Sequence, residues 1–186
     1  MRVVGGRLRG RELAGPKPGI GSIRPTSDRL RESLFNIIAH AHPDALEGAR
    51  MLDLFAGTGA FAFEALSRGA SFALMVDDGA EARGLMHDNQ EKLGVGGQSR
   101  IFRRDATKLG AISGLEPFGM LFCDPPYGKG LAEKALASAH AGGWILPSAL
   151  VIVEEAEEAG FTWPDGFSAV DERDYGKTRV YFAEMT

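Results

Sequence analysis

Residues 51–62 read MLDLFAGTGAFA, an apolar run that passes through a glycine turn into a second apolar stretch. The run from Met51 to Phe55 is short and apolar, which is typical of a strand buried in a sheet. From Phe61 to Leu66, apolar side chains recur at the spacing of one helix face. A strand, a tight glycine turn and a helix in this order predict the opening unit of an α/β fold.

The same alternation continues along the chain. We expect further strands at residues 73–76, 101–102, 120–123 and 150–153, and helices at residues 80–92 and 131–140. Residues 166–170 and 178–182 alternate as a closing hairpin of strands would. Strands that alternate with helices predict a mostly parallel sheet with helices on both faces.

The glycine turn has a spacing that nucleotide-binding proteins share. Residues 57–62 match G-x-G-x-x-A, and Asp77 follows the next strand, where an acid can bind ribose hydroxyls. Asp53 discriminates between ligands, because a carboxylate at this strand end repels a pyrophosphate and attracts an ammonium or sulfonium centre. The pattern therefore favours S-adenosylmethionine over a nicotinamide dinucleotide.

Two more acids follow strands. Asp105 precedes Ala106 and can accept a hydrogen bond from an adenine amino group, and Asp124 follows the strand at 120–123. A single acid at such a position often only caps nearby backbone amides. Four acids at successive strand ends indicate one shared ligand, because these ends meet at one edge of a parallel sheet.

Asp124 opens the tetrapeptide Asp-Pro-Pro-Tyr at residues 124–127. The ring of Tyr127 can stack on a planar heterocycle, while Asp124 and the Pro125 carbonyl can accept both hydrogens of an exocyclic amine. Pro125 and Pro126 stiffen the turn so that both acceptors can aim at one point. The alternative interpretation is a rigid turn whose acid bonds nearby amides. We take these four residues as the candidate catalytic group.

Positive charge gathers at the N-terminus. Residues 1–31 carry eight arginines and lysines against two acids, while the chain of 186 residues has a net charge of −4. On a hairpin strand, Arg7, Arg9 and Arg11 would share one face as a stripe about 13 Å long, at ~3.3 Å per residue. We expect this stripe to contact nucleic-acid phosphates, although a solvated surface hairpin is the alternative.

Residues 24–28 begin a helix. Thr26 or Ser27 can cap it, and Asp28 suits the positive end of the helix dipole. Arg24 and Thr26 lie just outside the helix, beside the body of the protein. Either could touch a ligand, although capping alone explains Thr26 equally well.

Composition limits the class of protein. The one cysteine, Cys123, excludes an internal disulfide and sits in an apolar strand, where we expect a small buried side chain. No apolar run approaches the ~20 residues of a membrane span and no signal peptide opens the chain, so we expect a cytoplasmic protein. His40, His42, His87 and His140 have no metal-site companions, and we expect no metal.

With these motifs in place, the chain resembles the Rossmann-like S-adenosylmethionine-dependent methyltransferases, through residues 53–59 and 124–127. It is most similar to the bacterial small-subunit (16S) ribosomal RNA guanine-N2 methyltransferases, through residues 5–10, 24–36 and 175–178. This resemblance implies a seven-stranded, mostly parallel sheet with its last strand antiparallel. We expect a basic hairpin arm over residues 1–23 and one methyltransferase domain over residues 24–186.

The resemblance also implies a reaction, which is methylation of the exocyclic N2 amine of one guanine in small-subunit ribosomal RNA. The expected cofactor-binding residues are Thr26, Asp53, Phe55, Ala56, Gly57, Gly59, Asp77, Asp105 and Ala106. The expected RNA-binding residues are Arg7, Arg9, Arg11 and Arg24. Asp77 departs from the family, in which relatives often have Glu. We expect a monomer that acts on ribosomal RNA, either free or within a partly assembled small subunit.

Other functions stay open on the residues alone. A DNA amino-methyltransferase would use the same chemistry, and a protein-glutamine methyltransferase would use the same pocket, usually with Asn at the position of Asp124. A nonenzymatic adenosine-binding assembly factor would not need Asp124. A nicotinamide oxidoreductase is least favoured because of Asp53.

Overall fold

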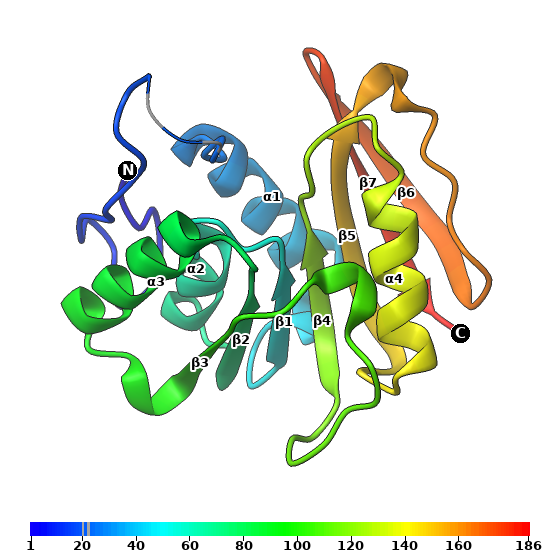
Figure 1. Cartoon of the computed structure of the whole chain (residues 1–186), viewed down its shortest axis with the longest axis horizontal. Coiled ribbons are helices and arrows are strands. Elements are labelled where there is room, and N and C mark those ends of the chain that lie inside the picture. Colours follow the sequence, from blue (N-terminus) through cyan, green and yellow to red (C-terminus); the bar gives the residue numbers. More distant parts are fainter. Residues whose placement is uncertain (20, 22) are drawn as a thin grey trace.

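Seven strands form one sheet in the computed structural model, which describes residues 1–19, 21 and 23–186 (Figure 1). They are β1 (Arg50–Leu54), β2 (Phe72–Val76), β3 (Ser99–Phe102), β4 (Phe118–Cys123), β5 (Ile145–Ala156), β6 (Phe167–Tyr175) and β7 (Thr178–Met185). Their spatial order is β3-β2-β1-β4-β5-β7-β6. Strands β1 to β5 pair in parallel, whereas β7 runs antiparallel to both β5 and β6. The predicted Rossmann-like sheet and its antiparallel last strand are confirmed.

The strand order reverses between β1 and β4. The chain moves outward from β1 to β3 and then returns to place β4 on the other side of β1. Ligands of open α/β sheets bind at the carboxyl ends of the strands beside such a reversal. The glycine turn follows β1, and Asp124 follows β4, so the fold places both motifs at this point.

Helices cover both faces of the sheet (Figure 1). The helices are α1 (Asp28–Ala41), α2 (Ala60–Ser67), α3 (Ala80–Leu93) and α4 (Leu131–Ala141). Buried side chains of α1, α2 and α3 belong to one apolar cluster, and those of α4 belong to a second cluster on the other face. The two clusters take alternate residues of the central strands, as Met51 and Leu52 of β1 show.

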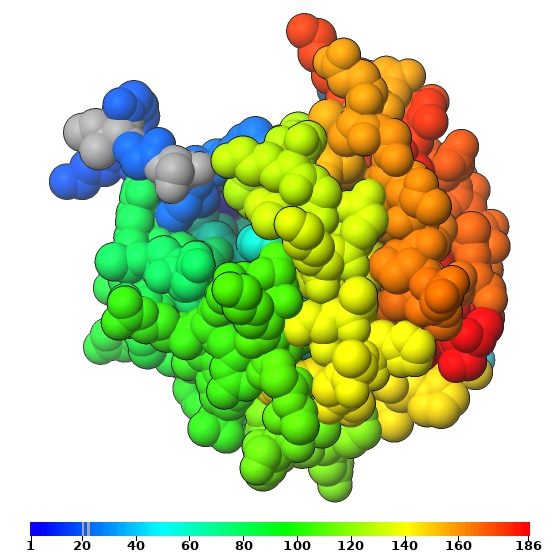
Figure 2. Space-filling view, turned by 45° about the vertical axis from the view of Figure 1, so that its right-hand side comes forward, coloured from blue at the N-terminus to red at the C-terminus, as the bar shows by residue number. Residues whose placement is uncertain are grey.

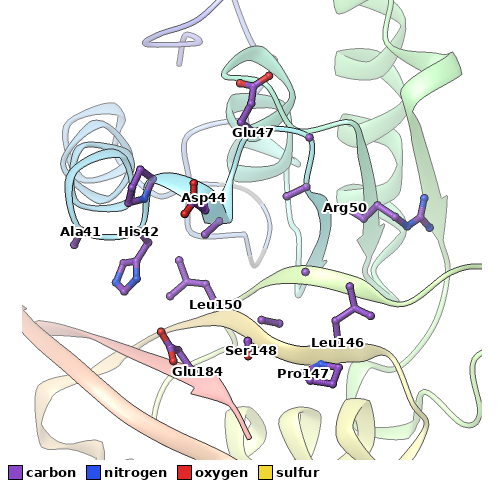
Figure 3. A pocket seen from close by; sticks show the side chains of 16 residues that line it. Ala41, His42, Asp44, Glu47, Arg50, Leu146, Pro147, Ser148, Leu150 and Glu184 are labelled. Atoms are coloured by element: carbon purple, nitrogen blue, oxygen red, sulfur yellow. The ribbon is translucent and has the colours of Figure 1, made fainter.

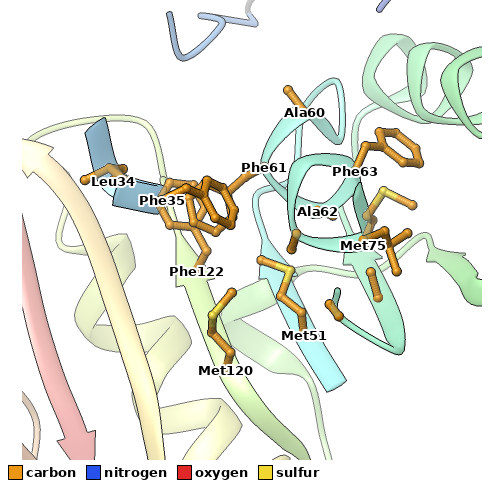
Figure 4. Packing of buried hydrophobic residues seen from close by; sticks show 14 of the residues in the cluster. Leu34, Phe35, Met51, Ala60, Phe61, Ala62, Phe63, Met75, Met120 and Phe122 are labelled. Carbon is orange, nitrogen blue, oxygen red and sulfur yellow. The ribbon is translucent and has the colours of Figure 1, made fainter. Parts of the chain in front are cut away.

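Three aromatic rings join the elements beneath the expected site (Figure 4). Phe61 of α2 stacks on Phe122 of β4 with ring centroids 3.8 Å apart, and Phe35 of α1 lies 4.6 Å from Phe61. Phe122 is two residues before Asp124. The stack therefore fixes the end of β4 against the two helices that flank it.

The N-terminal arm differs from the expected strand pair. Arg2 and Glu12 form one antiparallel bridge, and the chain between them is folded into turns, with positive φ angles of 76° at Gly6 and 84° at Gly10. Val3, Leu8 and Leu13 are buried in the cluster of α1, α2 and α3. The expected arginine stripe on a strand is wrong, because turns separate the arginines.

Strand β5 is longer than its apolar pattern indicated. It begins at Ile145, but Pro147 and Ser148 interrupt the apolar run and Ser148 has a φ angle of 64°. A register shift on β4, between Phe118 and Met120, accommodates this irregularity. No helix within residues 1–19, 21 and 23–186 has the length and apolar character needed to cross a membrane.

Candidate functional site

A hollow of about 600 Å³ lies at the carboxyl ends of the parallel strands. Figure 2 shows it between the N-terminal segment, in blue, and the yellow-green segment that follows β4. All four acids expected to share one edge line this hollow: Asp53, Asp77, Asp105 and Asp124. Their predicted gathering is confirmed. Phe55, Ala56, Gly57 and Thr26 line the same hollow.

The glycine turn has a backbone that few residues can adopt. Gly57 and Gly59 have positive φ angles of 59° and 80°, and a Cβ atom at Gly59 would lie 2.6 Å from the Phe63 ring. Phe55 also lies in the left-handed region, at a φ of 57°. Such strain in a non-glycine residue concentrates at ligand sites. The turn thereby brings bare backbone to the wall of the hollow, where a ligand can approach closely.

Asp77 braces the glycine turn. Its carboxylate accepts a hydrogen bond from the Gly57 amide at 3.0 Å and another from the Gly79 amide at 2.9 Å. Each carboxylate oxygen has a second lone pair, so Asp77 can still accept hydrogen bonds from a ribose diol. The local role and the ligand role are therefore compatible.

Asp105 also has a local role. Its Oδ1 accepts hydrogen bonds from the Thr107 hydroxyl at 2.7 Å and from the Thr107 amide at 2.9 Å. These bonds, the hydroxyl first, lower the pKa of Asp105 and keep it ionised as an acceptor. The next residue, Ala106, is buried and begins a 3₁₀ turn.

Asp53 is a buried acid with one unpaired carboxylate oxygen. Only 1% of its surface is exposed, and Oδ2 has no hydrogen-bond partner among the described residues. Loss of water through burial raises the pKa of Asp53 well above its usual range, and the nearby Asp77 raises it further. A buried carboxylate in this condition is stabilised by a cation, so the position fits a positively charged ligand.

Asp124 is held by two side chains from the segment before α1. Its Oδ1 lies 3.1 Å from Nη2 of Arg24, and its Oδ2 accepts a hydrogen bond from the Thr26 hydroxyl at 3.2 Å. Burial and then the charge of Glu154 raise the pKa of Asp124 well above its usual range, while Arg24 and Thr26 oppose the rise. Ser27, not Thr26, caps α1, which leaves Thr26 free to orient Asp124.

Tyr127 is not an open stacking surface in this structure. The guanidinium carbon of Arg24 lies 3.9 Å from the centre of its ring. The phenol donates a hydrogen bond to Oε1 of Glu154 at 2.7 Å and lies 3.1 Å from the Thr178 hydroxyl. The exposed Pro126 and the buried Pro125 carry the chain from Asp124 to this ring.

Glu154 is the residue that the sequence interpretation missed. It follows the apolar run 150–153, so the same signal that selected the other acids was present. Pairing of Cys123 with Val153 in the sheet places Glu154 beside Asp124. Its Oε1 also lies 3.4 Å from Nη1 of Arg24. A fifth acid therefore belongs to this edge.

The remaining arginines lie away from the hollow. Arg7 donates a hydrogen bond to the side chain of Gln98 at 2.7 Å, and Arg11 donates to the Lys92 carbonyl, so both lie near the end of α3. Arg9 is exposed. Of the four expected RNA-binding residues, only Arg24 lines the hollow, and the RNA contact of the others stays a prediction.

A second hollow, of about 570 Å³, lies at the opposite edge of the sheet (Figure 3). Its walls come from residues 41–45 and 47–50 before and at the start of β1, from Gly119, from residues 146–150 and from Glu184. None of the sequence-predicted site residues lines it. It is therefore not the candidate site.

The described part of the chain contains neither a cluster of metal-ligating side chains nor an exposed thiol. Residues 1–19, 21 and 23–186 contain no group of three His, Cys, Asp or Glu side chains that could hold a metal ion. Cys123 is fully buried, and burial raises the pKa of its thiol well above the usual value. A buried thiol with a raised pKa is a poor nucleophile.

Comparison with known proteins relates this site to a family. The family described as "Conserved hypothetical protein 95" matches residues 1–184. The protein named Ribosomal RNA small subunit methyltransferase D from Escherichia coli (strain K12) is 36% identical, over 99% of this chain and 90% of its own length. The protein of the same name from Haemophilus influenzae is 30% identical, over 95% of this chain and 89% of its own length. The solved structure of yhhF from Escherichia coli, 31% identical, superimposes with a TM-score of 0.83 and covers 100% of this chain and 97% of that one.

Proposed function

Since the chain belongs to the family described as Conserved hypothetical protein 95 and is a methyltransferase, we propose that it methylates the exocyclic N2 amine of a guanine in small-subunit ribosomal RNA, with S-adenosylmethionine as the donor. The observation that carries the proposal is the set of buried and half-buried acids around one hollow, in which Oδ2 of Asp53 has no hydrogen-bond partner among the described residues. The names of the relatives support ribosomal RNA as the substrate.

The residues around the hollow fit the donor. Asp53 would face its charged centre, Asp77 its ribose diol and Asp105 its adenine amine. The backbone of residues 55–59 would lie against the nucleoside, with Ala106 beside the adenine. When bound, S-adenosylmethionine supplies a methyl group on a positively charged sulfur that leaves as a neutral thioether.

Asp124 and the Pro125 carbonyl would act on the acceptor. The lone pair of the guanine amine is delocalised into the ring, which makes the nitrogen a poor nucleophile. Acceptors for both of its hydrogens localise the lone pair and hold the nitrogen in line for transfer, and such orientation supplies several kcal/mol of the barrier. The Thr26 hydroxyl holds the Asp124 carboxylate in place through its hydrogen bond to Oδ2.

Asp124 would also receive the proton that is released. The amine becomes acidic once it carries the methyl group, so a weak base is sufficient. Burial and Glu154 raise the pKa of Asp124, which makes it a better proton acceptor than an exposed aspartate. Positioning and electrostatic stabilisation are its main tasks.

A transfer assay tests the proposal. The purified protein is incubated with S-adenosylmethionine labelled in the methyl group and, in parallel, with small-subunit ribosomal RNA, small subunits assembled to different extents, DNA and ribosomal protein. We expect label only in RNA or subunits, recovered after digestion as N2-methylguanosine. Label in DNA or in glutamine would assign the protein to one of the alternative substrates, and binding of the donor without transfer would indicate an assembly factor.

The same assay separates free RNA from a particle as the substrate.

We also propose that the protein is a monomer, which sedimentation of the protein tests. Because the proposed substrate is ribosomal RNA, we also propose that the protein acts in the cytoplasm, where small subunits are assembled.

A further inference from the structure

The guanidinium of Arg24 occupies a position shaped for a planar group with two neighbouring N–H donors. Its central carbon lies over the Tyr127 ring, 3.9 Å from the ring centre, with one nitrogen 3.1 Å from Asp124 and the other 3.4 Å from Glu154. Guanine has the same arrangement on its C2 edge, where one carbon carries both N1–H and the N2 amine. Arg24 thus reproduces the part of guanine that the enzyme must hold.

Glu154 has unused capacity to bind a ligand. It is 1% exposed, and its Oε2 has no hydrogen-bond partner among the described residues. Its Oε1 is shared by the Tyr127 phenol and Arg24. A buried carboxylate oxygen without a donor is costly unless a ligand supplies one. Of the two side chains that contact Glu154, Arg24 is the one that can move away, because half of its side chain is exposed.

We propose that Glu154 accepts the N1–H of the target guanine while Asp124 accepts a hydrogen of its N2 amine. Arg24 leaves the Tyr127 ring when the base enters, and its exposed side chain turns toward the RNA backbone. Glu154 thereby selects guanine, since a purine with an unprotonated N1 would turn a lone pair toward a buried carboxylate. This inference rests on the proposed guanine-N2 activity.

2-Aminopurine provides the test, because it carries the same amine at C2 but has an acceptor at N1. Small-subunit RNA is assembled by ligation with guanine or 2-aminopurine at the methylated position, and kcat/KM is measured for each. We expect the wild-type protein to prefer guanine by at least about 100-fold, because a site built around a hydrogen bond rejects the analogue that lacks it. Equal turnover of the two RNAs would overturn the proposal without any variant.

The variant Glu154→Gln tests the residue itself. An amide can donate to N1 of 2-aminopurine, so we expect the preference for guanine to fall at least about tenfold. Glu155→Gln is the matched control: Glu155 is the next residue, is also buried and accepts hydrogen bonds from the Gly128 and Ala156 amides. We expect this control to keep the wild-type preference.

The outcomes separate this inference from the proposed function. If wild type methylates guanine and Glu154→Gln keeps the same preference, Glu154 does not read N1–H, although the proposed function stands. If wild type methylates no guanine in any RNA, the proposed function itself fails. Thermal unfolding and donor binding by calorimetry show whether Glu154→Gln is folded, and an unfolded variant leaves the wild-type comparison to decide.

Discussion

At the scale of single residues, the site is built from acids kept in unfavourable surroundings. Burial raises the pKa of both Asp53 and Asp124. Their positions could be predicted, because Asp124 directly follows an apolar strand and Asp53 lies one residue before the end of another. Their protonation state could not be predicted, because burial, the unpaired Oδ2 of Asp53 and the contact of Asp124 with Arg24 depend on segments far apart in the chain.

Asp124→Ala separates chemistry from donor binding. We expect methyl transfer to fall by at least about 1,000-fold, because the amine loses a positioned acceptor and its electrostatic stabilisation. Binding of S-adenosylmethionine, measured by calorimetry, is expected to stay within a few fold. Equal loss of both would reassign Asp124 to folding or to the donor site.

Asp53→Asn should change how stability depends on pH. The pKa of Asp53 in the folded protein is raised above the unfolded value, so its favourable contribution is complete below the unfolded pKa and is lost as pH rises through the folded pKa. Relative to wild type, the variant should therefore gain unfolding free energy as pH rises above about 4, the usual Asp value, by up to about 1.4 kcal/mol per pH unit until the folded pKa is reached. Urea unfolding at several pH values measures this difference.

The exposed Asp165 supplies the control for that experiment. Asp165→Asn is expected to follow wild type across the same pH range. Parallel curves for Asp53→Asn and wild type would show that Asp53 ionises in the folded protein as easily as in the unfolded chain.

At the scale of elements, periodicity predicted the helices and most strands within a few residues, because each buries one face. It failed where polar residues interrupt a strand, as Pro147 and Ser148 do in β5. It also failed for the arm, whose turns are set by contacts with Glu64 of α2. Glu64 is fully buried and accepts hydrogen bonds from the Val4 and Gly5 amides, both at 2.8 Å.

Glu64→Ala should release the arm and destabilise the body. Glu64 also binds the fully buried Arg31 at 3.1 Å, so its removal leaves a buried charge short of a partner. We expect a loss of about 3–5 kcal/mol in unfolding free energy. Trypsin should also cleave within residues 1–13 faster than in wild type.

The matched control is Glu12→Ala, in the arm itself. Glu12 pairs with Arg2 at 3.7 Å, but both side chains are largely exposed. Such a pair contributes less than about 1 kcal/mol. Similar effects of the two substitutions would show that Glu64 does not hold the arm.

At the scale of the whole molecule, charge is divided between the basic N-terminal segment and an acidic body. Arg7, Arg9 and Arg11 are exposed and have no ion-pair partner among the residues that the structure describes. The sequence predicted the excess of positive charge in this segment, but it did not predict that Arg7 and Arg11 lie near the end of α3. Their charge remains available to a polyanion.

Replacement of Arg7, Arg9 and Arg11 by Ala should weaken RNA binding and flatten its dependence on salt. Each phosphate contact contributes a slope of about 0.7 to 0.9, so the triple variant should lose up to about 2 to 3 log units per log unit of salt. RNA binding measured between low and moderate salt tests this. An unchanged slope would remove the arm from the RNA interface.

Arg173→Ala is the control for charge alone. Arg173 lies on β6 and is paired with Asp171 at 2.9 Å, at the far edge of the sheet. We expect the salt dependence of RNA binding to match wild type. A matching loss would indicate a general effect of net charge.

Calorimetric titration with S-adenosylmethionine tests directly whether acids at the carboxyl ends of the parallel strands bind a cationic methyl donor. We expect one donor per wild-type chain, no heat from a nicotinamide dinucleotide, and binding weakened at least about tenfold by Asp53→Asn, or about 1.4 kcal/mol. Absence of heat with wild type, or equally tight binding by Asp53→Asn, would contradict the claim.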